Sequence, residues 1–118
     1  MYHILESDLP ELHGTPKQVE WASDLRRRTL ISSNALIDET ASETIKSGCR
    51  KSIVYFVSNA RSCDPDEIYE EVETTIAKEK GISEEDVDVE DMNAEINKIA
   101  SDLILTKNSA QWWIEKAR

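Results

Sequence analysis

Thirteen carboxylate side chains lie in one stretch of 28 residues, from Asp64 to Asp91, where only Lys78 and Lys80 oppose them. Paired carboxylates can act as general acids and bases, but the sequence does not bury these, and solvent-exposed carboxylates are weak general acids at neutral pH. The stretch carries a charge of −11 and the remaining 90 residues carry +1, so the net charge of −10 is local. A concentrated negative field of this kind favours basic partners and speeds their association.

Other residues that could do chemistry are few. His3, His13, Cys49 and Cys63 could in principle hold zinc, but their spacing matches no zinc pattern. The three glycines stand apart, so there is no glycine-rich phosphate loop. No histidine belongs to a recognisable catalytic triad. The sequence therefore predicts a protein that is not an enzyme and that needs neither a metal nor another cofactor.

Length and composition indicate one domain, residues 1–118, with a modest core. Charged residues make up 32% of the chain, and no window approaches 18 consecutive apolar residues, so we expect no membrane-spanning helix. The N-terminus lacks the basic start and apolar core of a signal peptide. We therefore expect a cytoplasmic protein whose two cysteines stay reduced.

The clearest helix start combines Thr15 as N-cap, Pro16 at the first helical position and Gln18 as the capping-box partner. Residues before it, 1–14, look irregular. Val19, Ala22, Leu25 and Thr29 follow at helical spacing, with Trp21 at the edge of the stripe. Two alternatives remain for the end of this helix: it runs to about Lys46, or it breaks near residues 32–34, a Ser-Ser-Asn sequence of low helix propensity.

The apolar run Ile53–Val57 has the composition of a strand, yet a lone strand leaves backbone groups unpaired. The only other strand candidate, Leu103–Leu105, also fits a helix. We therefore predict that Ile53–Val57 is helical.

Further helix starts follow along the chain. Asp64, Pro65 and Glu67 predict a helix that ends at Gly81, and Ser83 with Asp86 predicts another start. Asn108-Ser109 precedes a final helix with its buried stripe at Ala110, Trp113, Ile114 and Ala117. These signals predict an all-α protein, a compact bundle of four or five helices joined by short connections.

The two ends of the chain resemble those of a loose group of small phage, plasmid and other mobile-element proteins, mostly of unknown function. The resemblance covers about a quarter of the chain and implies a genomic context rather than a mechanism. The matching residues are Gly14, Thr15, Lys17, Gln18, Val19, Trp21, Ala22, Leu25 and Arg26 near the start, and Ala110, Trp112, Trp113, Ile114, Glu115 and Arg118 at the end.

The positions of the three tryptophans predict different roles for them. Trp21 and Trp113 lie on or beside apolar stripes, and we expect them to pack against each other or on shared aliphatic residues. Trp112 is about 100° from Trp113 around a helix, so it is the better candidate for an interface. Arg26 falls inside an apolar stripe, which predicts a partly buried guanidinium paired with Glu115 or the carboxylate of Arg118.

The leading hypothesis is a non-enzymatic inhibitor or accessory protein of a mobile element, such as an anti-CRISPR-like protein. It would bind a basic, nucleic-acid-binding enzyme, for example a CRISPR effector or another defence nuclease, through acidic surface. We expect no direct binding of nucleic acid. The alternative is a structural or dimerising helical module, such as a homodimer, with a solubilising acidic region. The predicted partner-binding residues are Asp66, Glu67, Glu70, Glu71, Glu73, Glu84, Glu85, Asp86, Asp88 and Trp112.

Overall fold

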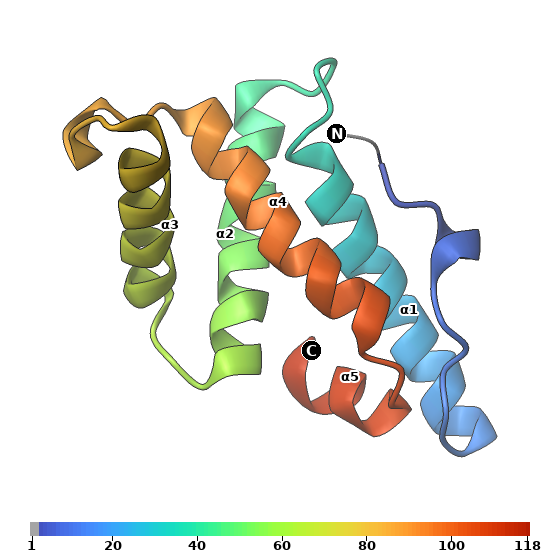
Figure 1. Ribbon diagram of the computed structural model, residues 1–118. Coiled ribbons are helices and arrows are strands. Elements are labelled where there is room, and N and C mark those ends of the chain that lie inside the picture. Colours follow the sequence, from blue (N-terminus) through green and yellow to red (C-terminus); the bar gives the residue numbers. More distant parts are fainter. Residues whose placement is uncertain (1–2) are drawn as a thin grey trace.

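The computed structural model describes residues 3–118 and confirms the all-α prediction (Figure 1). Met1 and Tyr2, which belong to the predicted irregular segment 1–14, lie outside the described residues. Within residues 3–118, five α-helices are joined by short connections, with one 3₁₀ turn before the first helix and another between the third and the fourth. The helices are α1 (Pro16–Ala35), α2 (Glu43–Arg61), α3 (Pro65–Lys80), α4 (Val89–Thr106) and α5 (Ala110–Lys116), and the turns are η1 (Glu6–Asp8) and η2 (Glu84–Asp86).

Helix α4 crosses the middle of the bundle and contacts α1, α2 and α3 (Figure 1). Helix α5 packs mainly on α1, whereas α3 lies at one side and contacts only α2, α4 and the η2 turn closely. The molecule is accordingly elongated, with extents of 48 × 31 × 22 Å. This arrangement leaves one side of α4 open beside α3, where part of the acidic stretch faces it.

Helix α1 begins with the predicted capping box. The Thr15 hydroxyl accepts a hydrogen bond from the Gln18 amide at 3.2 Å, and the Gln18 side chain accepts one from the Thr15 amide at 3.0 Å. The helix ends at Ala35, so the alternative of one long helix to about Lys46 is wrong. The end coincides with Asn34, whose side chain binds both backbone polar groups of Ile4 and ties the N-terminal segment to α1.

The prediction that Ile53–Val57 is helical is confirmed, since the run lies inside α2. Ile53, Val54, Phe56 and Val57 are buried, and Tyr55 points outward with 59% of its surface exposed. A run of β-branched and aromatic residues therefore forms a helix here because nearly all of its circumference is covered by α1, α3, α4 and α5.

Helix α3 begins and ends as predicted, with the Glu67 carboxylate accepting from the Asp64 amide at 2.9 Å and Gly81 in the left-handed conformation. The predicted start at Ser83 is wrong. Ser83 caps only the η2 turn, and α4 begins at Val89, where the Asp88 carboxylate accepts from the Asp91 amide at 2.9 Å. Ser83 and Asp88 both cap a helical turn, but only the turn that follows Asp88 continues into residues that are buried in the bundle.

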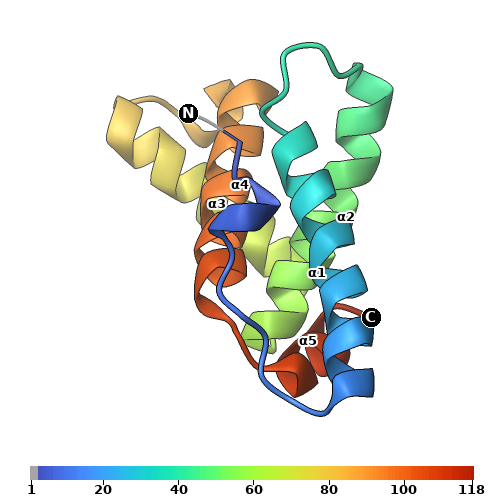
Figure 2. The same cartoon turned by 90° about the vertical axis from the view of Figure 1, so that its right-hand side faces the viewer.

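Residues 3–14 lie along α1 and α4 as an irregular strap with one 3₁₀ turn (Figure 2). Its last residues meet the start of α5: the His13 amide donates to the Asn108 carbonyl at 2.8 Å, and the Ala110 amide donates to the His13 carbonyl at 2.9 Å. These two bonds bring the two ends of the chain together.

The expected packing of Trp21 on Trp113 is wrong. Trp113 is fully buried, but Trp21 is 47% exposed, and its ring lies 6.0 Å from the guanidinium of Arg118. The core-facing side of α1 begins at Ala22, one position later, so Trp21 is turned about 100° away from it.

The predicted carboxylate partner of Arg26 is also wrong. The Arg26 side chain is buried as expected, but its Nη1 donates to the backbone carbonyl of Pro10 at 2.6 Å. Burial lowers the pKa of Arg26, and the nearby Glu6 carboxylate partly opposes that effect. The guanidinium thus fastens the N-terminal strap to α1.

Candidate functional site

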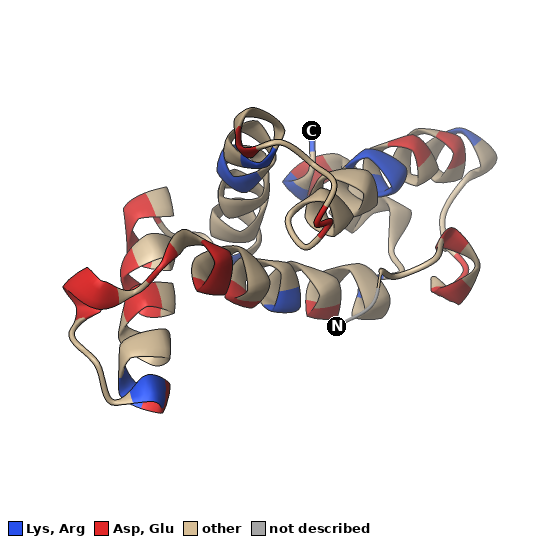
Figure 3. Ribbon diagram, turned by 90° about the horizontal axis from the view of Figure 1, so that it is seen from above, with Lys and Arg blue, Asp and Glu red and all other residues tan. Residues whose placement is uncertain are grey.

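The acidic stretch occupies one side of the molecule. Carboxylates lie along α3, around the η2 turn and on the first turn of α4 (Figure 3). The buried residues Ile68, Val72 and Ile76 hold α3 to the bundle by its opposite side. The charge concentration predicted from the sequence is therefore also a concentration in space.

Five carboxylates of the stretch have local partners. Glu71 pairs with Arg61, and Asp91 pairs with Lys80, whose pKa is raised chiefly by the hydrogen bond and then by the negative charge of Asp91. Glu84 accepts from the Thr74 hydroxyl at 2.6 Å, while Glu67 and Asp88 cap helices, as described above. These five carboxylates therefore stabilise the local structure and also contribute negative charge to the surface.

Several other predicted binding residues are free to contact a partner protein. Within the described part of the chain, Asp66, Glu70, Glu85 and Asp86 are exposed and form no ion pair. Glu73 is half-buried, so it presents less of its side chain to solvent than a fully exposed carboxylate does. The outward acidic face of α3 consequently centres on Asp66 and Glu70.

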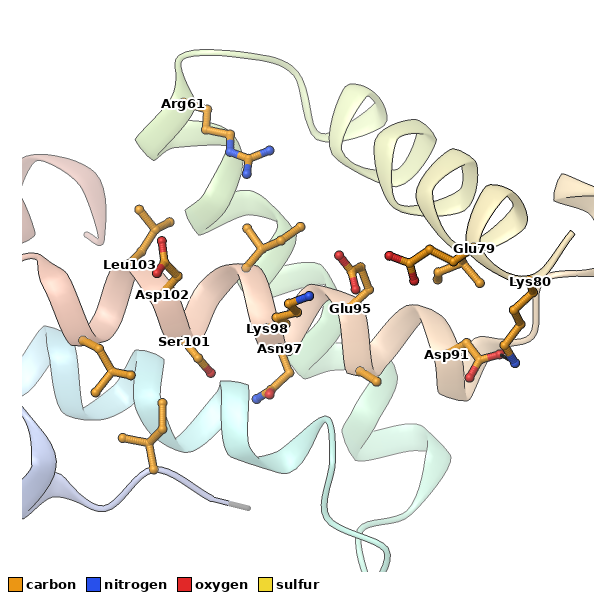
Figure 4. Close-up of a pocket in the computed structure, with 15 residues that line it drawn as sticks. Arg61, Glu79, Lys80, Asp91, Glu95, Asn97, Lys98, Ser101, Asp102 and Leu103 are labelled. Atoms are coloured by element: carbon orange, nitrogen blue, oxygen red, sulfur yellow. Dashed lines mark hydrogen bonds and ion pairs between the residues drawn. The ribbon is translucent and has the colours of Figure 1, made fainter. Parts of the chain in front are cut away.

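An open groove with a volume of about 830 Å³ runs between α3 and the solvent-facing side of α4 (Figure 4). We call it the α3–α4 groove. Its charged rim comes from both helices: Glu79 and Lys80 on α3, and Asp91, Glu95, Lys98 and Asp102 on α4, with Arg61 of α2 at one end. In Figure 4, Glu79 reaches from α3 toward Glu95 on α4.

The floor of the groove is apolar. Ile76 of α3 is buried, and Ile99 and Leu103 of α4 are half-buried. Leu105 and Ile4 extend the apolar lining on the side of α4 that faces α1, because Leu105 is turned about 200° from Leu103 and Ile4 bonds Asn34 of α1. The combination of aliphatic floor and charged rim is what an amphipathic segment of another protein requires.

The rim carries more negative than positive charge. Arg61 and Lys80 are already paired, with Glu71 and Asp91 respectively. That leaves Glu79, Glu95 and Asp102 as carboxylates without an ion pair in residues 3–118, against Lys98 alone. The groove therefore has capacity for additional cations.

Sequence reasoning missed most of the groove. Glu95 and Asp102 lie beyond the acidic stretch from Asp64 to Asp91. A signal was available, because residues 91, 95, 98 and 102 are charged and recur at spacings of four and three, which places them on one side of a helix. That spacing gives no indication that α3 forms the other wall of the α3–α4 groove.

Trp112 lies on α5, outside the groove. Its ring is half-buried and makes edge-to-face contacts with Phe56, at a centroid distance of 6.0 Å, and with Trp113, at 5.2 Å. The ammonium of Lys107 lies 5.6 Å from the ring centroid. Trp112 therefore contributes to packing, and only part of its ring is open to a partner.

The alternative zinc set of His3, His13, Cys49 and Cys63 is not brought together. Cys49 lies within α2 and Cys63 lies beyond its last residue, which separates them by on the order of 20 Å along the helix axis. Among residues 3–118, no three His, Cys, Asp or Glu side chains are grouped to hold a metal ion. In the same residues, no helix has the length and apolar character needed to cross a membrane.

Comparison with protein families, with curated proteins and with solved structures finds no match to this chain.

Proposed function

We propose that this protein is a non-enzymatic binding protein that captures a basic segment of a nucleic-acid-binding protein on the acidic side of its bundle. The observation that supports this most is the α3–α4 groove, where Glu79, Glu95 and Asp102 surround an aliphatic floor without cationic partners from residues 3–118. An amphipathic helix rich in Lys and Arg matches both features, because its apolar side covers the floor and its cations meet the rim.

The outward face of α3 would act at longer range. Asp66, Glu70, Glu85 and Asp86 are exposed and distributed over α3 and η2, so they extend the negative field beyond the groove. Fields of this kind accelerate encounter and lose their effect as salt shortens the Debye length to about 8 Å and below. The groove would then supply the short-range contacts that slow dissociation.

The partner in this proposal is a protein whose basic surface normally binds nucleic acid. A basic channel that normally holds nucleic acid presents many cations on one surface, and an array of carboxylates can occupy the same cations as phosphates do. The resemblance of both chain ends to mobile-element proteins favours a defence nuclease, such as a CRISPR effector, as that partner. In this role the protein would act as an inhibitor or an accessory factor.

The first test uses a defined probe rather than an unidentified partner. The probe is a labelled amphipathic peptide of the length of α4, 18 residues, with Leu on one side and Lys and Arg on the other. Fluorescence anisotropy should show saturable binding that weakens steeply with salt. A peptide of the same composition in scrambled order keeps the charge but loses the apolar side, and it should bind at least about tenfold more weakly, since 1.4 kcal/mol corresponds to a factor of ten.

Two triple variants of equal charge change separate the groove from bulk acidity. Glu79→Lys with Glu95→Lys and Asp102→Lys reverses the rim, whereas Glu11→Lys with Glu20→Lys and Glu39→Lys reverses three exposed carboxylates that lie away from it. The rim variant should abolish peptide binding, and the control should retain most of it. Equal loss in both variants would mean that net charge alone is responsible, and the groove proposal would be wrong.

A second comparison addresses inhibition and the alternative function. In a pull-down from cells that carry a defence nuclease, the wild-type protein should retain a basic protein and displace nucleic acid from it, and the rim variant should not. Light scattering on the purified protein tests the alternative of a dimerising module. A stable dimer that the rim variant disrupts, together with no binding of the peptide, would favour that alternative.

A further inference from the structure

The unpaired carboxylates of the α3–α4 groove are gathered at two points along its length. Glu95 and Asp102 are seven residues apart on α4, which places them on the same side of the helix and about 10.5 Å apart along its axis. Glu79 extends from α3 toward Glu95 (Figure 4). The groove therefore offers two carboxylates at one point and Asp102 at the other, and none of the three forms an ion pair within residues 3–118.

The floor between these two points is aliphatic. Ile99 follows Glu95 by four residues, precedes Asp102 by three, and is half-buried. Leu103 lies one turn after Ile99, and the buried Ile76 belongs to the α3 wall. An apolar side chain of a partner that contacts Ile99 would thus lie between two points of negative charge.

Lys98 places a positive charge between the same two points. It is exposed, follows Glu95 by three residues, precedes Asp102 by four, and forms no ion pair within residues 3–118. Residues three and four apart are neighbours on the surface of a helix. The rim of α4 is therefore negative, then positive, then negative over two turns. A partner cation opposite Lys98 would meet a like charge, which disfavours binding.

We propose, on the basis of the function proposed above, that the α3–α4 groove selects helices of partner proteins by the spacing of their cations. The preferred helix carries two Lys or Arg residues seven positions apart, with aliphatic residues at the third and fourth positions after the first, and no cation in the turn between. These positions share one side of a helix over two turns, so they match the repeat of Glu95, Ile99 and Asp102. A helix that is basic at every turn binds less well despite its greater charge.

The preferred segment belongs to another protein rather than to a second copy of this chain. None of the Lys and Arg residues of the sequence are seven positions apart, so no helix of the chain carries the required pair. The excess of carboxylates on the rim equally favours a partner with cations over a copy of an acidic protein.

Two peptides of identical composition test the spacing, by fluorescence anisotropy with the full chain at low salt. The spaced peptide has two Arg residues seven positions apart and Leu at the third and fourth positions after the first. The close peptide exchanges the second Arg with the Leu at the fourth position. The spaced peptide should bind roughly two- to fivefold more tightly, the range expected for one exposed ion pair. Asp102→Asn should remove that preference, because only one point of negative charge remains.

A second pair of peptides tests the positive charge between the two points. Both derive from the spaced peptide and carry either Arg or Gln at the third position after the first Arg. The wild-type protein should bind the Gln peptide more tightly, although the Arg peptide is more basic. Lys98→Gln removes the like charge, so the Arg peptide should then bind at least as tightly as the Gln peptide.

Lys51→Gln is the matched control for Lys98→Gln. It removes the same charge from an exposed position of α2 that does not line the groove, so the wild-type order of the Arg and Gln peptides should persist. Circular dichroism verifies that each variant is folded.

The outcomes separate this inference from the proposed function. Equal affinity for the spaced and close peptides, or equal effects of Lys98→Gln and Lys51→Gln, would overturn selection by spacing and leave a general basic-segment groove in place. No saturable binding of any peptide would overturn both. Self-association of the protein that the spaced peptide reverses would identify a second copy as the occupant and would also contradict the inference.

Discussion

The indole ring of Trp113 lies parallel to the phenyl ring of Phe56, with 5.4 Å between ring centroids and an interplanar angle of 9°. Trp113 is fully buried, and its Nε1 donates to the backbone carbonyl of Lys107 at 2.8 Å. One side chain of α5 therefore packs on α2 and also fixes the connection that follows α4. This position makes Trp113 the principal anchor of the C-terminal helix.

Trp113→Ala should destabilise the protein by about 3–5 kcal/mol, because it opens a large cavity and leaves the Lys107 carbonyl without its donor. Trp21→Ala is the control: its ring is 47% exposed, and the change should cost less than about 1 kcal/mol. Urea unfolding followed by circular dichroism measures both. Similar costs for the two variants would contradict the arrangement of tryptophans described here.

Asn97→Ala should cost about 1–3 kcal/mol. Its buried amide donates from α4 to the backbone carbonyl of Ser33 at 2.8 Å and to the Ser33 hydroxyl at 3.0 Å on α1, and both acceptors lose their donor in the variant. The double variant with Ser33→Ala should cost less than the sum of the single changes, since the two residues share the interaction. Strict additivity in urea unfolding would show that this contact does not couple α1 to α4.

Two glycines should respond to alanine in opposite directions. At Gly14, whose φ is +157°, an added Cβ would lie 2.9 Å from the Cβ of Ala110, so Gly14→Ala should disturb the contact between the chain ends and destabilise the protein by roughly 1–3 kcal/mol. At Gly48, inside α2, nothing lies within 4 Å of an added Cβ, and Gly48→Ala should stabilise it by about 0.5–1 kcal/mol. Thermal unfolding should separate the two variants clearly, and a stabilising Gly14→Ala would disprove the close approach.

The thiol of Cys63 should react more slowly with an alkylating agent than free cysteine does at the same pH. Desolvation, then the negative charge of Glu67, raises the pKa of Cys63, and only the thiolate is nucleophilic. Because the folded pKa lies above that of the free thiol, the midpoint of the rate-against-pH curve should shift to higher pH.

Glu67→Gln tests the electrostatic part of that shift. Glutamine keeps the capping-box acceptor for the Asp64 amide and removes the charge, so the midpoint should move part of the way back to lower pH. Alkylation is measured in a Cys49→Ser background, so that only Cys63 reacts. An unchanged midpoint would assign the whole shift to desolvation.

Local signals in the sequence predicted most of the helices. Thr15 with Gln18 and Asp64 with Glu67 act over three residues, so their effect is independent of the rest of the chain. The start of α4 was misplaced because Ser83 and Asp88 both form caps locally, and only burial of the following residues on the bundle distinguishes a single turn from a helix. The sequence also did not indicate which helices contact one another.

By itself the sequence determined the helical class, the start of three helices and the concentration of negative charge between Asp64 and Asp91, since each depends on neighbours along the chain. Only the tertiary structure decided that Trp21 is exposed, that Arg26 bonds Pro10, and that Glu79 and Glu95 share one groove. The physical reason is that periodicity reveals which side of a helix is buried but carries no information about the helix that buries it, and grooves and charge clusters form where two or three helices meet.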